Sequence, residues 1–111
     1  MKAIITLLAL GLSASAVFAA EPIEGKWKTA NGETADIRSC DGSFCITLKT
    51  GKFAGKTIGT LKGTDSSYTG EITDPETNKT YSGSANISGN AMRLKGCVLG
   101  ILCKSQSWTR I

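Results

Sequence analysis

The sequence predicts an all-β protein, a small antiparallel meander of about eight strands that closes into a barrel. Glycines recur between short runs that are rich in Thr, Ile, Val and Tyr, as they do between consecutive β-hairpins. Apolar and polar residues alternate within these runs, and no helical period is sustained beyond the first twenty residues. A barrel is favoured over a sandwich because closure removes the exposed edges of the sheet.

The N-terminus has the pattern of a secretory signal peptide, which is expected to form a helix. Lys2 supplies the positive charge, residues 3–12 are apolar, and small residues follow. This apolar stretch is too short to span a bilayer, which takes about 20 residues. We expect cleavage after Ala19, with Ala16 as the alternative, so that residues 20–111 form a single domain. No Cys lies near either cleavage site, so neither a lipid anchor nor a membrane span is expected, and the protein should be periplasmic or secreted.

Each predicted strand places one apolar face toward the core. Turn residues separate the strands at Asn31-Gly32, Asp41-Gly42, Asp74-Pro75 and Gly89-Asn90. The residues expected to face inward are Trp27, Ala35, Ile37, Phe44, Ile46, Leu48, Tyr68, Ile72, Tyr81, Ala85, Ile87, Met92 and Leu94.

The last run, residues 102–110, does not alternate cleanly. If Leu102 and Trp108 face inward, the two-residue period also turns Lys104 and Gln106 inward. We therefore expect a β-bulge near Lys104 or Ser105 to shift the phase of this strand.

Four cysteines in an exported chain predict two disulfides. Cys40 and Cys45 flank the Asp41-Gly42 turn, and a four-residue hairpin loop would make them direct cross-strand partners. Cys97 and Cys103 are similarly close and also face outward. We predict the pairs Cys40–Cys45 and Cys97–Cys103, with the two other connectivities left open. A zinc site is disfavoured because structural sites usually pair ligands at closer spacing, so no metal or cofactor is expected.

The composition argues against an enzyme. The chain has no histidine, which removes the commonest general base and excludes triad chemistry. Asp74 and Glu76 share a loop after Glu71, but a turn in which Asp74 bonds backbone amides and Pro75 fixes the next dihedral explains them better than a catalytic carboxylate pair. Without Lys2 the net charge is 4 − 1 = +3, which is mild and dispersed, and nucleic acid is not an expected partner.

The two ends of the domain are expected to meet. Trp27 lies on the first strand and Arg110 on the last, and these strands are neighbours in a closed meander. We expect Trp27 to plug one end of the barrel and Arg110 to lie across the indole in a cation–π contact.

The G-x-W opening and the Arg on the last strand resemble the lipocalin-like barrels of the calycin superfamily. Residues 72–81 (ITDPETNKTY), 94–97 (LKGC) and 105–110 (SQSWTR) together resemble the bacterial DUF2147 family of exported proteins, over 25–110. Many members have a longer segment where this chain has residues 50–63, and Asn78 stands where they usually have Gly. The resemblance implies the fold and the compartment but no catalytic residue, because the family's function is undefined.

Two functional hypotheses follow, both non-enzymatic. In the first, a monomeric envelope protein binds a small apolar or amphipathic ligand in the barrel mouth, lined by Trp27, Phe44, Tyr68, Tyr81 and Met92. In the second, the barrel is a protein-binding module such as an inhibitor of a lysozyme or protease. The positive charge disfavours a basic lysozyme as the target, because like charges slow encounter.

Overall fold

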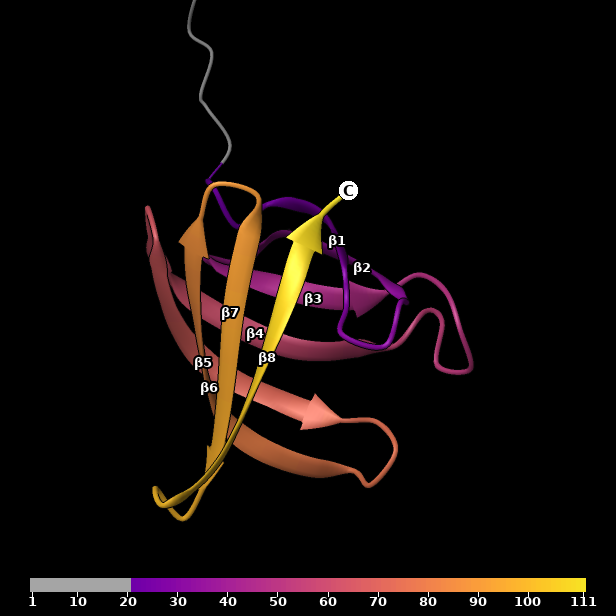
Figure 1. Ribbon diagram of the computed structural model, residues 1–111, viewed down its shortest axis with the longest axis vertical. Helices are drawn as coiled ribbons and strands as arrows, with labels where there is room; N and C mark the ends of the chain where they lie inside the picture. The colour runs from indigo at the N-terminus through magenta and orange to yellow at the C-terminus, as the bar shows by residue number, and fades with distance from the viewer. Residues whose placement is uncertain (1–20) are drawn as a thin grey trace, which may run out of the picture.

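The computed structural model of the protein describes residues 21–111 (Figure 1). The predicted signal peptide, its helix and both cleavage sites lie outside these residues. The described chain forms eight strands and no helix. The strands are β1 (Gly25–Lys28), β2 (Thr34–Cys40), β3 (Ser43–Leu48), β4 (Thr57–Thr64), β5 (Ser67–Asp74), β6 (Lys79–Ser88), β7 (Ala91–Val98) and β8 (Leu102–Arg110).

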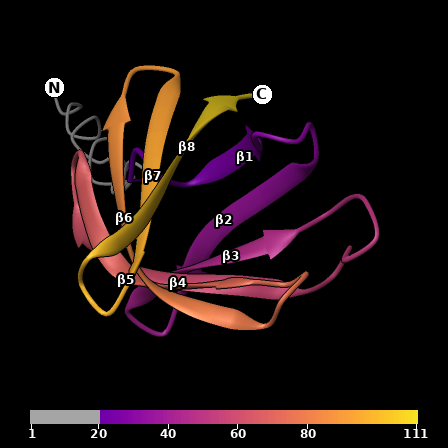
Figure 2. The same ribbon diagram turned by 60° about the horizontal axis from the view of Figure 1, so that its bottom comes forward.

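The strands pair in chain order and the sheet closes on itself, which confirms the predicted antiparallel barrel (Figure 2). Closure is made by a short seam between β1 and β8, in which only Trp27↔Arg110 and Lys28↔Thr109 are paired. The other seven strand pairs are longer, with four to eight paired positions each. The β1–β8 seam is therefore where the barrel has the fewest ladder hydrogen bonds.

The alternation predicted from the sequence describes the interior well. Buried apolar side chains come from all eight strands and from Ile23 just before β1, and they form one continuous core. On β1, for example, Trp27 is fully buried while Lys26 and Lys28 are outside. The buried apolar residues are Ile23, Trp27, Ala35, Ile37, Ile46, Leu48, Ile58, Leu61, Tyr68, Ala85, Met92, Leu94 and Trp108.

The expected bulge near Lys104 or Ser105 is wrong. The ladder between β7 and β8 runs without interruption from Ala91↔Thr109 to Val98↔Leu102. Because directly paired residues point to the same side of the sheet, Lys104 opposite Gly96 and Gln106 opposite Leu94 both face inward. The two polar residues are tolerated there because this part of the interior is a cavity that opens to solvent, not packed core.

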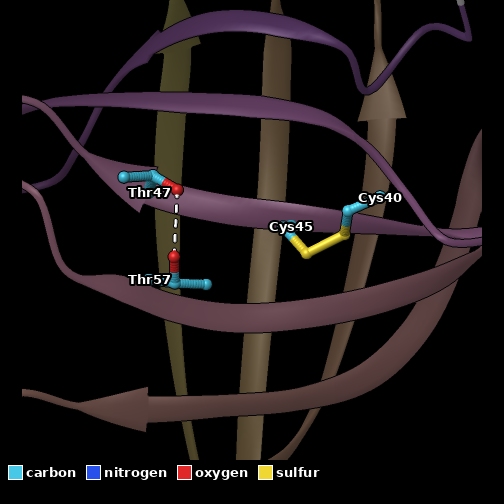
Figure 3. The surroundings of a disulfide bond; sticks show 4 residues. All are labelled: Cys40, Cys45, Thr47 and Thr57. Atoms are coloured by element: carbon cyan, nitrogen blue, oxygen red, sulfur yellow. Dashed lines mark hydrogen bonds between the residues drawn. A yellow bond between two sulfur atoms is a disulfide. The ribbon is translucent and has the colours of Figure 1, made fainter.

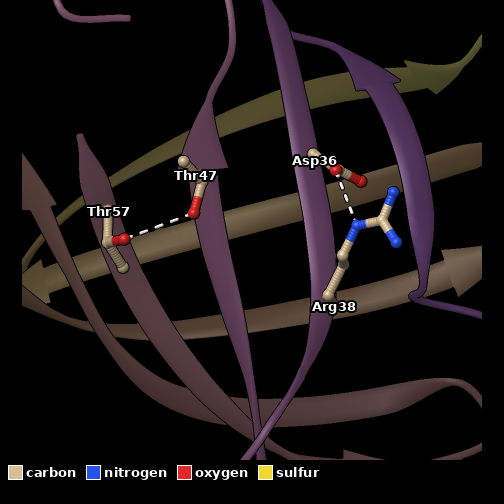
Figure 4. Close-up of polar contacts among 4 residues, drawn as sticks. All are labelled: Asp36, Arg38, Thr47 and Thr57. Carbon is tan, nitrogen blue, oxygen red and sulfur yellow. Dashed lines mark hydrogen bonds and ion pairs between the residues drawn. The ribbon is translucent and has the colours of Figure 1, made fainter. Parts of the chain in front are cut away.

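The irregularity in the ladder lies instead between β3 and β4. Ile46 pairs with Gly59 but Thr47 pairs with Thr57, so Ile58 is the extra residue of a β-bulge. The Thr47 and Thr57 hydroxyls are 3.2 Å apart and bridge the two strands at this point (Figures 3 and 4). Because of the bulge, Ile58 is buried although it is adjacent to Gly59, and the rest of β4 keeps its alternation of inward and outward side chains.

Both predicted disulfides are present, although the first has a different register from the one expected. Cys40 pairs with Ser43 in the ladder, and Cys45 pairs with Arg38, so the bonded cysteines are diagonal neighbours (Figure 3). The loop has two residues rather than four, because Asp41 and Gly42 both take the left-handed backbone of a tight hairpin turn. Cys97 and Cys103, in contrast, are direct cross-strand partners.

One acidic side chain on the outer face of the barrel is covered. Asp36 is 5% exposed, and its Oδ2 accepts a hydrogen bond of 2.8 Å from Nε of the exposed Arg38 (Figure 4). That hydrogen bond and the negative charge of Asp36 raise the pKa of Arg38 above its ordinary value. The pair lies outside the barrel, on the far side of β2 from the cavity.

Candidate ligand-binding cavity

The barrel interior divides into a packed end and an open end. A cavity of about 500 Å³ occupies the open end, within the range of about 300 to 1,000 Å³ that is typical of small-molecule sites. Three loops surround its mouth, residues 29–33, 49–56 and 75–78, and they lie together at one end of the barrel (Figures 1 and 2). The apolar lining side chains are Leu48, Phe53, Ile58, Ile72, Tyr81, Leu94 and Trp108.

A row of glycines makes room for the cavity. Gly70, Gly83 and Gly96 are paired side by side across β5, β6 and β7, on the inner face of the sheet. A Cβ on Gly83 would lie 2.8 Å from Ile72 Cδ1, and one on Gly96 would lie 3.1 Å from Tyr81 Cβ. Ile72 and Tyr81 therefore lie flat against bare backbone, which leaves the centre of the barrel open.

Lys104 continues the glycine row onto β8 and is a cation on the cavity wall. It forms no ion pair with any residue in 21–111. Gln106 lies two residues further along the same face, and its Oε1 accepts a hydrogen bond of 2.9 Å from Trp108 Nε1. This bond fixes the amide so that its NH₂ group remains as a donor. The Lys104 ammonium and the Gln106 amide donor lie beside the apolar lining of the cavity. This arrangement suits a ligand that has an anionic or polar head group and an apolar body.

Negative side chains stand at the other side of the mouth. Glu33, Asp74 and Glu76 border the cavity. Glu33 accepts a hydrogen bond from the Thr50 hydroxyl, which ties the 29–33 loop to the 49–56 loop. Asp74 Oδ1 accepts one of 2.9 Å from the Glu76 amide, the turn role expected from the sequence. The cavity therefore has Lys95 and Lys104 on the β7–β8 wall, whereas the loops at its mouth carry these three carboxylates together with Lys52.

The four aromatic side chains and Met92 that were predicted to line the barrel mouth lie in two different parts of the interior. Tyr81 lines the cavity, and Asp74 and Pro75 border it. Trp27, Tyr68 and Met92 are fully buried in the packed end. Phe44 packs edge-on against the Tyr68 ring, with the ring centroids 5.6 Å apart. These large side chains fill the end of the barrel opposite the mouth.

Several lining residues were missed by sequence reasoning. Lys104 and Gln106 were indicated by the two-residue period but were assigned to a bulge. Phe53 lies in the 49–56 loop, which has no strand period to reveal it, and it packs against the core. Trp108 was expected inside, but nothing in the sequence showed that it would be at the cavity rather than in the packed end.

The packed end is closed by residues 21–24. Trp27 Nε1 donates a hydrogen bond of 2.9 Å to the Ile23 carbonyl. The Arg110 guanidinium lies over the Trp27 ring, 4.2 Å from its centroid, and donates hydrogen bonds to the Pro22 and Glu24 carbonyls. Arg110 thus holds both the indole and the segment that covers it.

Tyr68 secures the same segment from the other side. Its single hydroxyl proton is shared between two acceptors, Glu21 Oε1 and the Asp65 carbonyl oxygen, each 3.0 Å from the phenol oxygen. Burial of the phenol, and then its hydrogen bond to Glu21, raise the pKa of Tyr68 to about 12 from an ordinary value of 10.0. Ionisation would remove the donor and place two negative charges side by side.

Tyr68→Phe is expected to lower the free energy of unfolding by about 1 kcal/mol, the net contribution of a typical hydrogen bond. The pH dependence gives a sharper readout. Because the folded pKa is raised, the stability linked to Tyr68 is complete below pH 10 and is lost as the pH rises toward 12. Urea unfolding of both proteins across this range should show their stabilities converging; a constant difference would contradict the assignment.

The described residues contain no group of three or more His, Cys, Asp or Glu side chains that could hold a metal ion. Between residues 21 and 111 there is also no helix long and apolar enough to cross a membrane.

The fold and the cavity define the chain as a small, closed, eight-stranded antiparallel barrel that is open at one end. A family described as "Uncharacterized protein conserved in bacteria (DUF2147)" matches residues 47–110, which is more than half of the chain. The protein belongs to this family. The match begins near the end of β3, so it is shorter than the 25–110 expected from the motifs. No curated protein and no solved structure matches the chain.

The turn that carries the family resemblance keeps its form in this chain. Asn78, which replaces the usual Gly, has φ 62°, in the left-handed region that Asn tolerates better than most residues. Its amide donates 2.7 Å to the Asp74 carbonyl and closes the turn at the rim of the cavity.

Proposed function

We propose that the protein is an exported, non-enzymatic envelope protein that binds a small amphipathic ligand in the open end of the barrel. The observation that carries this proposal is the cavity of about 500 Å³, which has apolar side chains below and the inward-facing Lys104 and Gln106 on its wall. The apolar body of the ligand would lie on Ile72, Tyr81 and Trp108.

Export is supported by the two disulfides, because such bonds persist in oxidising compartments and are rare in the cytosol. A small disulfide-bonded domain of a bacterial family fits the periplasm or the medium. A binding role rather than a catalytic one is supported by the absence of histidine and by the turn function of Asp74.

The charge of Lys104 gives the proposal a ligand preference. An ammonium that has no ion pair with residues 21–111 forms a charge-assisted hydrogen bond with a carboxylate or phosphate, and such a bond contributes about 1.5–3 kcal/mol. A ligand with a carboxylate head should therefore bind about tenfold or more tightly than the alcohol of the same chain length.

Displacement of a neutral fluorescent naphthylamine probe tests both the binding of an amphipathic ligand in the cavity and the preference for a carboxylate head group. We expect dodecanoate and dodecanol to displace the probe from the mature protein, and dodecanoate to do so at lower concentration. Lys104→Met keeps the length and the apolar stem of the side chain but removes its charge, so dodecanoate should lose its advantage while dodecanol is unaffected.

Lys62→Met is the matched control, because Lys62 lies on the outer face of β4 and borders no part of the cavity. It should leave both affinities unchanged. If neither compound displaces the probe, ligand binding in the barrel is wrong. If both displace it and Lys104→Met changes nothing, the cavity binds ligands but Lys104 does not recognise their head group.

A further inference from the structure

The tip of the β7–β8 hairpin exposes a cluster of large apolar side chains. Leu99 is 89% exposed, Ile101 79% and Leu102 64%. Within residues 21–111, the other large apolar side chain exposed to this degree is Ile111, which follows β8 at the opposite end of that strand. Three such residues among four consecutive positions form a patch that the folded barrel leaves uncovered.

This tip, residues 98–102, is held away from the sheet. The ladder between β6 and β7 ends at Ser82↔Cys97, while β7 and β8 stay paired as far as Val98↔Leu102. Beyond Cys97 the β7–β8 hairpin therefore separates from β6, which stays paired with β5, and it projects as two strands at the bottom of Figure 1. The Cys97–Cys103 disulfide crosses its base and holds the tip in one conformation.

Leu99, the residue at the turn, has an unfavourable backbone conformation. Leu99 has φ 55°, in the left-handed region that L residues with a Cβ seldom adopt. The other described non-glycine residues with positive φ are Asp41, Asp65 and Asn78, which tolerate this region through their short polar side chains. Leu99 has neither that advantage nor any burial to offset the strain, so folding does not explain a leucine at this position.

The charged side chains of β7 and β8 are all basic. From residue 91 to the C-terminus the chain has no acidic residue, but it has Arg93, Lys95, Lys104 and Arg110. Lys95 is four residues before Leu99, or about 13 Å along an extended strand. An apolar tip inserted about 5–10 Å into the boundary between headgroups and acyl chains would therefore place this basic group near the lipid phosphates.

The small size of the patch favours a bilayer over a protein partner. A stable protein interface buries about 800 Å² and 20 to 30 residues on each side, far more than a five-residue tip offers. Membrane association, in contrast, gains from each apolar side chain inserted and from each nearby cation facing anionic lipid. We propose that the tip of the β7–β8 hairpin inserts into the surface of an anionic lipid bilayer.

Sedimentation of the mature, oxidised protein with vesicles tests the proposal. We expect binding to vesicles that contain phosphatidylglycerol and phosphatidylcholine, weaker binding to phosphatidylcholine alone, and a decrease with added salt. Leu99→Asn should reduce the partition coefficient about tenfold or more. The same substitution should leave the melting temperature unchanged or raise it, because Asn suits the left-handed turn better than Leu.

Ile111→Asn is the control, since it removes an equally exposed apolar side chain from the other end of β8 and should leave vesicle binding unchanged. The proposal is overturned if Leu99→Asn binds vesicles as the wild type does, or if the two lipid compositions bind equally. It is also overturned if the tip instead drives self-association, seen by analytical ultracentrifugation without vesicles and abolished by Leu99→Asn.

Discussion

Trp27→Ala is expected to lower the free energy of unfolding by about 3–5 kcal/mol, the usual cost of truncating a buried tryptophan. Trp27 is fully buried, and its indole N–H is bonded to the Ile23 carbonyl. It also pairs with Arg110 in the seam where only two residue pairs join β1 to β8. The loss would therefore empty the packed end and weaken barrel closure at the same place.

Urea denaturation followed by far-ultraviolet circular dichroism measures this effect. Trp27→Phe is the matched variant, because it keeps most of the apolar volume and the surface under Arg110 but loses the N–H donor. Its expected loss is smaller than that of Trp27→Ala. A melting temperature near that of the wild type for Trp27→Ala would show that the indole does not hold the barrel closed.

Gly70→Ala is expected to cost about 3 kcal/mol or more, because the methyl group would collide with backbone rather than with a flexible side chain. A Cβ on Gly70 would lie 2.0 Å from the Thr60 carbonyl oxygen and 2.9 Å from Leu61 Cα. The β4 and β5 strands would have to separate to admit it, which breaks part of the ladder between them.

Gly96→Ala separates this effect from the general cost of altering a glycine in a strand. Gly96 belongs to the same inner row, but its new Cβ would lie 3.1 Å from Tyr81 Cβ and 3.4 Å from Tyr81 Cγ, so a shift of a few tenths of an ångström beside the open cavity would admit it. We expect Gly96→Ala to cost less than about 1.5 kcal/mol. Equal losses for the two variants, measured by the same urea titration, would mean that the close approach of β4 to β5 is not what requires Gly70.

The cavity and the hairpin tip are structurally continuous but can be tested separately. Lys104 lies on the cavity wall, and the exposed tip ends two residues before it, at Leu102. Lys104→Met tests recognition of the ligand head group by probe displacement, and Leu99→Asn tests membrane binding by vesicle sedimentation. The two experiments therefore share no readout. A barrel that binds amphipathic molecules next to a bilayer surface would have its ligand source within reach.

Most of the strand pattern was predictable because a two-residue period needs only local information. Trp27, Ile46, Ala85 and Leu94 are buried as the alternation requires, and the Asp41-Gly42 turn is in its expected place. The disulfide pairs followed from proximity in sequence, although the two-residue turn made Cys40 and Cys45 diagonal rather than direct partners.

The sequence by itself determined an all-β meander, its turns and the meeting of Trp27 with Arg110, and it favoured the two cysteine pairs, because these depend on local periodicity and on the adjacency of successive hairpins. Only the tertiary structure decided where the barrel is empty. Whether Lys104 and Gln106 face core or cavity depends on what the seven other strands place opposite them, and the glycine row across β5, β6 and β7 provides that space. Void volume is a property of the closed barrel, and no single strand encodes it.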